Sequence, residues 1–147
     1  MSLPRLAQAS LGLGGLILMG MGGYFVVLRP PLLPEDVRYA GASLAQIQSA
    51  IPGFMPWISQ VFGVLGGYMF ATGLLIAYLA IASFRDARPL PTAVVTISGL
   101  ASIGWMAATI FLIDSDFKWL LLAFVLPWVV TVVSSLVADM RVFEAQN

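Results

Sequence analysis

The sequence has no cysteine and no histidine, and four long stretches of it contain no charged residue at all. Without cysteine, the chain can form no disulfide and offers no thiolate for catalysis. Haem and most transition-metal sites use histidine or cysteine ligands, so we expect no cofactor and no metal. The formal net charge of zero gives no support for the clustered basic surface that nucleic-acid binding requires. We therefore expect no nucleic-acid partner.

What the sequence has in abundance is apolar residues, which make up 60% of it, while only 10% are charged. The uncharged stretches are residues 11–28, 57–84, 90–113 and 119–138. A hydrocarbon core of roughly 30 Å takes about 20 helical residues to cross, and backbone groups in lipid must pair within the protein. The sequence therefore predicts an all-α integral membrane protein, an antiparallel four-helix bundle that forms a single membrane domain over residues 1–147, with membrane lipids around it.

Orientation is predicted from the basic residues that flank the spans. Four lie on the side of the two termini and three on the other: Arg5, Arg85, Arg88 and Arg141 against Arg29, Arg38 and Lys118. This difference favours cytoplasmic termini. The first stretch ends in Leu28-Arg29-Pro30-Pro31 instead of a small-x-small cleavage motif, so we expect it to remain in the mature protein.

Catalysis finds little support in the sequence. Proton relays and ion-coupled pumps place ionisable side chains inside the membrane, and the four uncharged stretches have none. Paired carboxylates occur outside them, at Glu35-Asp36 and at Asp114-Ser115-Asp116. We interpret these pairs as a helix start and a solvated turn, so we expect a protein that is not an enzyme.

The loop between the first two spans, residues 29–56, contains signals of local structure. Pro34 followed by two acids is typical of a first helical turn, and Ser43 with Gln46 resembles a capping box. We expect a short amphipathic helix near residues 44–50. Two interpretations stay open, a connector packed over the bundle and a surface for a partner. The candidate partner residues are Glu35, Asp36, Arg38 and Tyr39.

Glycines gather on one side of each of the first two spans. On the first span the glycine side covers an arc of about 100°, and Ile17 and Met21 lie on the opposite side, where we expect lipid. Small residues permit the close helix approach on which packing in lipid depends. The predicted packing residues are Gly12, Gly15, Gly22 and Gly23 on the first span and Gly63, Gly66, Gly67 and Gly73 on the second.

The last two spans contain polar residues at helical spacing. The third span aligns three hydroxyl residues with a tryptophan, and the fourth carries another hydroxyl four residues after Pro127, which should bend that helix. Such a seam either lines a small ligand cavity or consists of hydroxyls bonded to their own helix backbone. Its residues are Ser98, Ser102, Trp105, Thr109 and Thr131.

Four short segments carry a family resemblance: Leu33-Pro34-Glu35-Asp36, Arg38-Tyr39, residues 52–57 and Gly66-Gly67-Tyr68. They resemble small, uncharacterised four-helix bacterial membrane proteins that are DoxX-like in size and layout. The resemblance implies a bacterial cytoplasmic (inner) membrane and no particular activity.

Two functions follow from these patterns. The first is a noncatalytic accessory or assembly subunit that packs against itself, as a homo-oligomer, or against a larger membrane protein partner. The alternative is an intramembrane binder or carrier of a small apolar or lipid-like ligand.

Overall fold

The structure is a computed structural model that describes residues 3–82 and 89–146. Within these two ranges the chain is helical and contains no β-strand. Residues 83–84, where the second uncharged stretch ends, and residues 85–88, which follow it, lie outside the described residues. The elements are α1 (Leu3–Val27), α2 (Pro34–Ala40), α3 (Leu44–Ala50), α4 (Phe54–Ala82), α5 (Pro89–Gly99), the π-helical segment η1 (Leu100–Gly104), α6 (Trp105–Leu112), α7 (Lys118–Ala123) and α8 (Leu126–Gln146).

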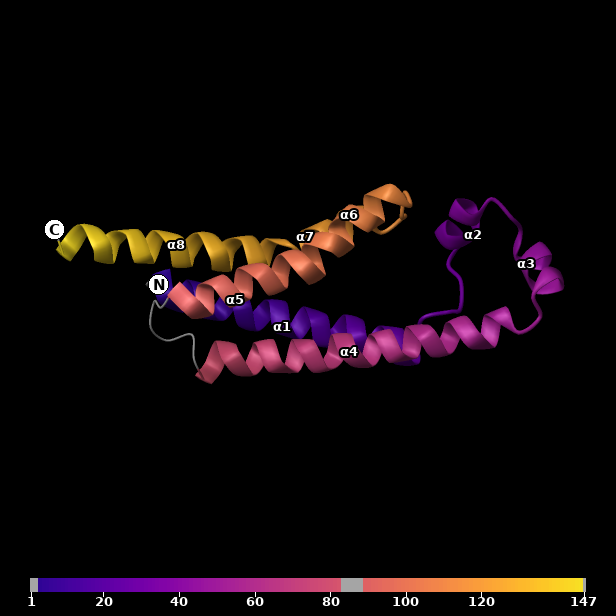
Figure 1. The fold of residues 1–147 in the computed structure, drawn as a ribbon, viewed down its shortest axis with the longest axis horizontal. Helices are drawn as coiled ribbons and strands as arrows, with labels where there is room; N and C mark the ends of the chain where they lie inside the picture. The colour runs from indigo at the N-terminus through magenta and orange to yellow at the C-terminus, as the bar shows by residue number, and fades with distance from the viewer. Residues whose placement is uncertain (1–2, 83–88, 147) are drawn as a thin grey trace.

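Four helical stretches of the described chain are long and apolar enough to cross a membrane. They are Leu3–Val27, Phe54–Ala82, Ala93–Leu112 and Lys118–Ala138. The predictions of an all-α chain and of four apolar helices are confirmed, and they indicate an integral membrane protein. Figure 1 shows the start of α1 and the end of α8 at one end of the long helices, with α2 and α3 at the opposite end.

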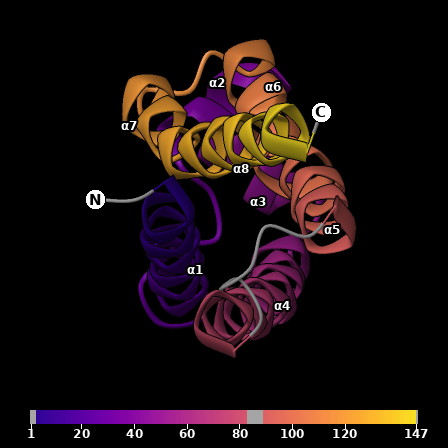
Figure 2. The same ribbon diagram turned by 90° about the vertical axis from the view of Figure 1, so that its left-hand side faces the viewer.

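Helix α1 makes the most extensive contacts with other helices. It packs along α4 on one side and against α8 on another, and α5 in turn packs against α8 (Figure 2). In the described residues α4 and α5 share no extensive contact, although they follow one another in the chain. The buried apolar core lies chiefly where α1 meets α4 and α8, and its members are Ala7, Leu11, Leu18, Ile76, Ala80, Val95, Ile103 and Trp128.

The contact between α1 and α4 depends on four glycines. A Cβ atom on Gly22 would lie 2.5 Å from the backbone nitrogen of Phe70, and one on Gly15 would lie 2.8 Å from the carbonyl oxygen of Gly73. Gly66 meets α1 equally closely, at 2.7 Å from the carbonyl oxygen of Gly22. Backbone therefore meets backbone at positions seven residues apart on each helix, which only glycine permits.

The other predicted packing glycines lie differently. A Cβ on Gly12 would make an ordinary contact with Ala80, at 3.8 Å. On Gly23, Gly63 and Gly67 a Cβ would meet no packed neighbour within 4 Å. The contact between α1 and α4 thus follows one narrow row on each helix, whereas the sequence pattern assigned glycines over a wider arc.

The third span contains a wide turn that the sequence pattern did not indicate. In η1 the N–H of Trp105 donates to the carbonyl oxygen of Leu100, five residues earlier. An extra residue in a turn rotates everything after it by about 100° relative to a continuous α-helix. Trp105 is consequently 74% exposed, away from the interior in which the predicted seam placed it.

The fourth span is interrupted just before Pro127. Helix α7 ends at Ala123, and α8 begins at Leu126, consistent with the helix break that a proline imposes. The hydroxyl of Thr131 donates to the carbonyl oxygen of Pro127 at 2.7 Å. Thr131 is fully buried and lies 3.4 Å from the carbonyl oxygen of Ala7, so it belongs to the contact between α8 and α1.

Candidate functional site

A cavity of about 630 Å³ lies between α1, α2, α6 and α7. Its walls are almost entirely apolar, and they come from the parts of the first, third and fourth spans that lie toward α2 (Figure 1). The chief apolar lining residues are Ile17, Met21, Met106, Ile110, Leu120, Leu121 and Phe124. The volume falls within the roughly 300–1,000 Å³ that is typical of small-molecule sites.

Glu35 forms part of the polar end of this cavity. It stands in the first turn of α2, directly after Pro34, where a carboxylate is favoured by the positive end of the helix. Its side chain is buried, with only 2% of the residue exposed. Oε1 accepts a hydrogen bond from the Ser115 hydroxyl at 3.1 Å, whereas Oε2 is buried and has no hydrogen-bond partner among the described residues.

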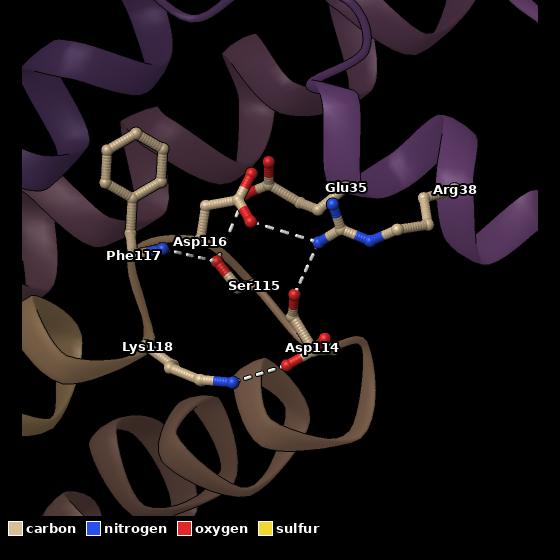
Figure 3. A network of polar contacts seen from close by, with 7 residues as sticks. All are labelled: Glu35, Arg38, Asp114, Ser115, Asp116, Phe117 and Lys118. Carbon is tan, nitrogen blue, oxygen red and sulfur yellow. Dashed lines mark hydrogen bonds and ion pairs between the residues drawn. The ribbon is translucent and has the colours of Figure 1, made fainter.

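Ser115 reaches Glu35 from the turn between α6 and α7 (Figure 3). The N–H of Phe117 donates to the Ser115 hydroxyl oxygen at 3.2 Å. Because the Phe117 N–H occupies a lone pair of the Ser115 oxygen, the hydroxyl proton points toward the Glu35 carboxylate. The short α2 helix and the α6–α7 turn therefore meet at one buried polar contact.

Arg29 lines the same end of the cavity as Glu35, but its guanidinium group interacts with other side chains. Its guanidinium group lies 3.4 Å from the ring centroid of Phe62 and 5.2 Å from that of Phe25, both within cation–π range. Its Nη2 also donates to Oδ2 of Asp36 at 2.9 Å, and the Arg29 side chain is only 6% exposed. Arg29 and Asp36 thus neutralise each other.

A second set of charges holds α2 to the α6–α7 turn from the outside (Figure 3). Arg38 donates to the carbonyl oxygen of Asp114 at 2.6 Å and to Oδ1 of Asp116 at 3.2 Å. Lys118 pairs with the Asp114 carboxylate four residues before it. The hydrogen bond and the charge of Lys118 lower the pKa of Asp114 below its ordinary value of 3.8, and the charge of Arg38 adds to this effect. These exposed contacts join α2 to the turn that carries Ser115.

The four candidate partner residues therefore differ in their surroundings. Glu35 faces inward, and Asp36 and Arg38 bind other parts of the same chain. Of the four, Tyr39 presents the largest free surface, with 62% of the residue exposed. At three of the four positions the side chain thus makes contacts within this chain.

The predicted polar seam does not line the 630 Å³ cavity. Its hydroxyls bond to their own helix: Ser102 donates to the carbonyl oxygen of Ser98 at 2.6 Å, and Thr109 to that of Trp105 at 3.0 Å. A smaller apolar cavity of about 230 Å³ lies between the third span and α8, and it includes none of the five seam residues. Trp128, which the sequence pattern did not single out, lines it and is 5% exposed.

Ile17 and Met21 lie opposite the α1–α4 contact, as their spacing requires, yet they line the cavity. Helical spacing predicts that Ile17 and Met21 lie opposite the glycines. It does not predict that α6 and α7 form the facing wall of the cavity, because this depends on the packing of segments that are distant in sequence.

The site combines apolar walls with one polar end. In the part of the chain that the structure describes, no group of three or more acidic side chains is placed to hold a metal ion.

Comparisons of the chain with protein-family models, with curated proteins and with solved structures give no match.

Proposed function

We propose that this protein is a noncatalytic membrane protein that binds a small amphiphilic, lipid-like molecule in the cavity between α1, α2, α6 and α7. The observation that carries the proposal is the combination of about 630 Å³ of apolar space with a buried carboxylate oxygen that has no partner among the described residues. An apolar tail would fill the walls, and a polar head would reach Glu35. Sites of this kind pair an apolar lining with a few placed polar groups.

The proposal includes a location. We infer an antiparallel four-span domain in a bacterial cytoplasmic membrane, with both termini cytoplasmic and with α2 and α3 on the outer side. The count of basic flanking residues supports this orientation, and the resemblance of the four short segments supports a bacterial cytoplasmic membrane. The cavity would then open within the outer leaflet, where amphiphiles with apolar tails are abundant.

Orientation is testable because the chain has no cysteine. A membrane-impermeant thiol reagent applied to intact cells should label Ser43→Cys, in the exposed outer loop, and not Ser83→Cys, which lies outside the described residues. Labelling of the second variant alone would reverse the orientation.

Ligand binding is testable by native mass spectrometry after extraction in a mild detergent. The proposal expects a bound lipid or small amphiphile on most of the protein molecules at low collision energy. Protein that is stripped of every adduct under conditions in which other membrane proteins keep theirs would count against the proposal.

A second function, assembly with another membrane helix, is favoured by the surface of α4. This helix packs chiefly on α1 and only lightly on α3, and a Cβ added at Gly63 or Gly67 would meet no packed neighbour within 4 Å. Small residues on an uncovered face suit close approach of a further helix. The same mass spectra decide this question, because a homo-oligomer or a partner subunit would appear at its own mass.

A further inference from the structure

The polar end of the cavity carries one acidic group more than its surroundings neutralise. Arg29 is paired with Asp36 at 2.9 Å, Arg38 with Asp116 at 3.2 Å, and Lys118 with Asp114. Glu35 forms no ion pair among the described residues, and its Ser115 partner is neutral. Every described cation on this side of the protein is therefore already engaged by another carboxylate.

A buried carboxylate in this position has a strong requirement for a partner. Burying a charge without one is costly, and a hydrogen bond to a charged group is stronger than one between neutral groups. Oε2 of Glu35 is buried at the wall of the cavity, with no partner in the described part of the chain. A donor group on a molecule inside the cavity would complete its hydrogen bonding.

From this arrangement we infer that the ligand is a cationic amphiphile whose head is a primary ammonium group. Its N–H donors would bind Oε2 of Glu35, and its positive charge would compensate the carboxylate. The inference rests on the proposed function, because it assumes that the cavity holds the tail of an amphiphile.

Anionic and neutral heads fit less well. A phosphate or carboxylate head would approach Glu35 and Asp36 with the same sign of charge, and Arg29 already donates to Asp36. A hydroxyl head could donate one hydrogen bond to Oε2 but would leave the charge of Glu35 uncompensated. The site therefore favours an ammonium head over a hydroxyl and over an anion.

The shape of the cavity suits a linear tail. Its lining on α1 runs from Ile17 to Phe25, nine residues whose ends lie about 12 Å apart at the rise of an α-helix. This length leads from the head site at α2 toward the middle of the membrane. An unbranched alkyl chain would lie along it between α1 and the α6–α7 segment.

The test compares three probes that share one tail: dodecylammonium, dodecanol and dodecanoate. Their binding to the full-length protein in detergent is measured by titration in native mass spectrometry. We expect dodecylammonium to bind about tenfold or more tightly than dodecanol, because it adds a charge-assisted hydrogen bond, and dodecanoate to bind most weakly. In Glu35→Gln, which keeps the side-chain shape, the preference for the ammonium probe should disappear.

A second variant tests the binding of the tail separately from that of the head. Gly20 lines the cavity, and a Cβ there meets no neighbour within 4 Å, so Gly20→Leu adds bulk to the cavity without a backbone clash. It should weaken the binding of all three probes. Equal binding of the ammonium and hydroxyl probes to the wild type, with both weakened by Gly20→Leu, would overturn the ammonium inference and leave the proposed function standing.

Other outcomes are equally distinct. Tightest binding of dodecanoate would overturn the inference about charge. Binding of no probe, or binding that Gly20→Leu leaves unchanged, would contradict the proposed function itself. The comparison of probes on the wild type keeps the test decisive even where Glu35→Gln folds poorly.

Discussion

The hydroxyl of Ser115 donates to the buried carboxylate of Glu35 at 3.1 Å across 80 residues of sequence. This contact joins α2, in the first loop, to the turn that follows α6, and it leaves the second carboxylate oxygen without a partner among the described residues, at the wall of the cavity. The polar end of the cavity therefore depends on two segments that are distant in sequence.

Replacing Ser115 by alanine should destabilise the protein. The change removes a buried hydrogen bond to a charged group, which is worth about 1.5–3 kcal/mol. We expect Ser115→Ala to lower the temperature of unfolding in detergent, measured by circular dichroism. Ser49→Ala serves as the control, since the Ser49 hydroxyl lies on the surface and bonds only to its own helix. An equal effect of the two changes would mean that the Glu35 contact contributes nothing.

Leucine at Gly22 should disrupt the packing of α1 on α4. Its Cβ would lie 2.5 Å from the Phe70 backbone nitrogen, and backbone can yield only if the helices separate. Overpacking of this kind costs about 1–3 kcal/mol or more. Gly23→Leu makes the same substitution one residue later, where no packed neighbour lies within 4 Å. Thermal unfolding of the two variants should differ clearly, and equal stabilities would contradict the arrangement of α1 and α4.

Trp128 should be important for its bulk and not for its N–H group. The indole contacts α1 and α5, where a Cβ on Gly14 would lie 3.2 Å from Nε1 and one on Gly99 would lie 2.7 Å from Cε3. Nε1 is buried with no hydrogen-bond partner among the described residues. We expect Trp128→Ala to cost about 3–5 kcal/mol of stability and Trp128→Phe much less. Equal losses of the two variants in chemical denaturation would contradict a role that rests on bulk.

The apolar helices can be predicted readily from the sequence, because uncharged runs of this length have few alternatives. The close contacts at Gly15 and Gly22 follow from their seven-residue spacing, which places both on one side of a helix. Periodicity predicts that these glycines share one side of the helix, but it does not predict which helix packs against that side. It assigns Gly23, Gly63 and Gly67 to packing as well, and these meet no packed neighbour within 4 Å.

The cavity cannot be predicted in the same way. The seam through Trp105 assumes an uninterrupted α-helix, and the π turn at Leu100–Gly104 rotates the residues that follow it. Nothing in the sequence around Glu35 indicates that Ser115 contacts it. One available signal is the pair of short acidic motifs, which the predicted four-span topology assigns to the same side of the membrane and which the structure brings together.

Acid should weaken the α6–α7 turn only at low pH. The folded pKa of Asp114 is lowered by Lys118, so the ionised form stabilises the turn. That contribution is fully present above the ordinary pKa of 3.8 and is lost as the pH falls through the lowered folded value. An NMR titration of the Asp114 carboxyl carbon should give a midpoint below 3.8 that rises in Lys118→Gln. An unchanged midpoint in that variant would contradict the assignment to Lys118.

The most direct measurement compares amphiphile binding by Gly20→Leu and Gly23→Leu. Both changes place leucine on α1 where a Cβ has free space, but only Gly20 lines the cavity. In native mass spectrometry titrations with dodecylammonium, Gly23→Leu should bind like the wild type, and Gly20→Leu should bind about tenfold or more weakly. Equal binding by the two variants would show that the cavity between α1, α2, α6 and α7 is not the binding site.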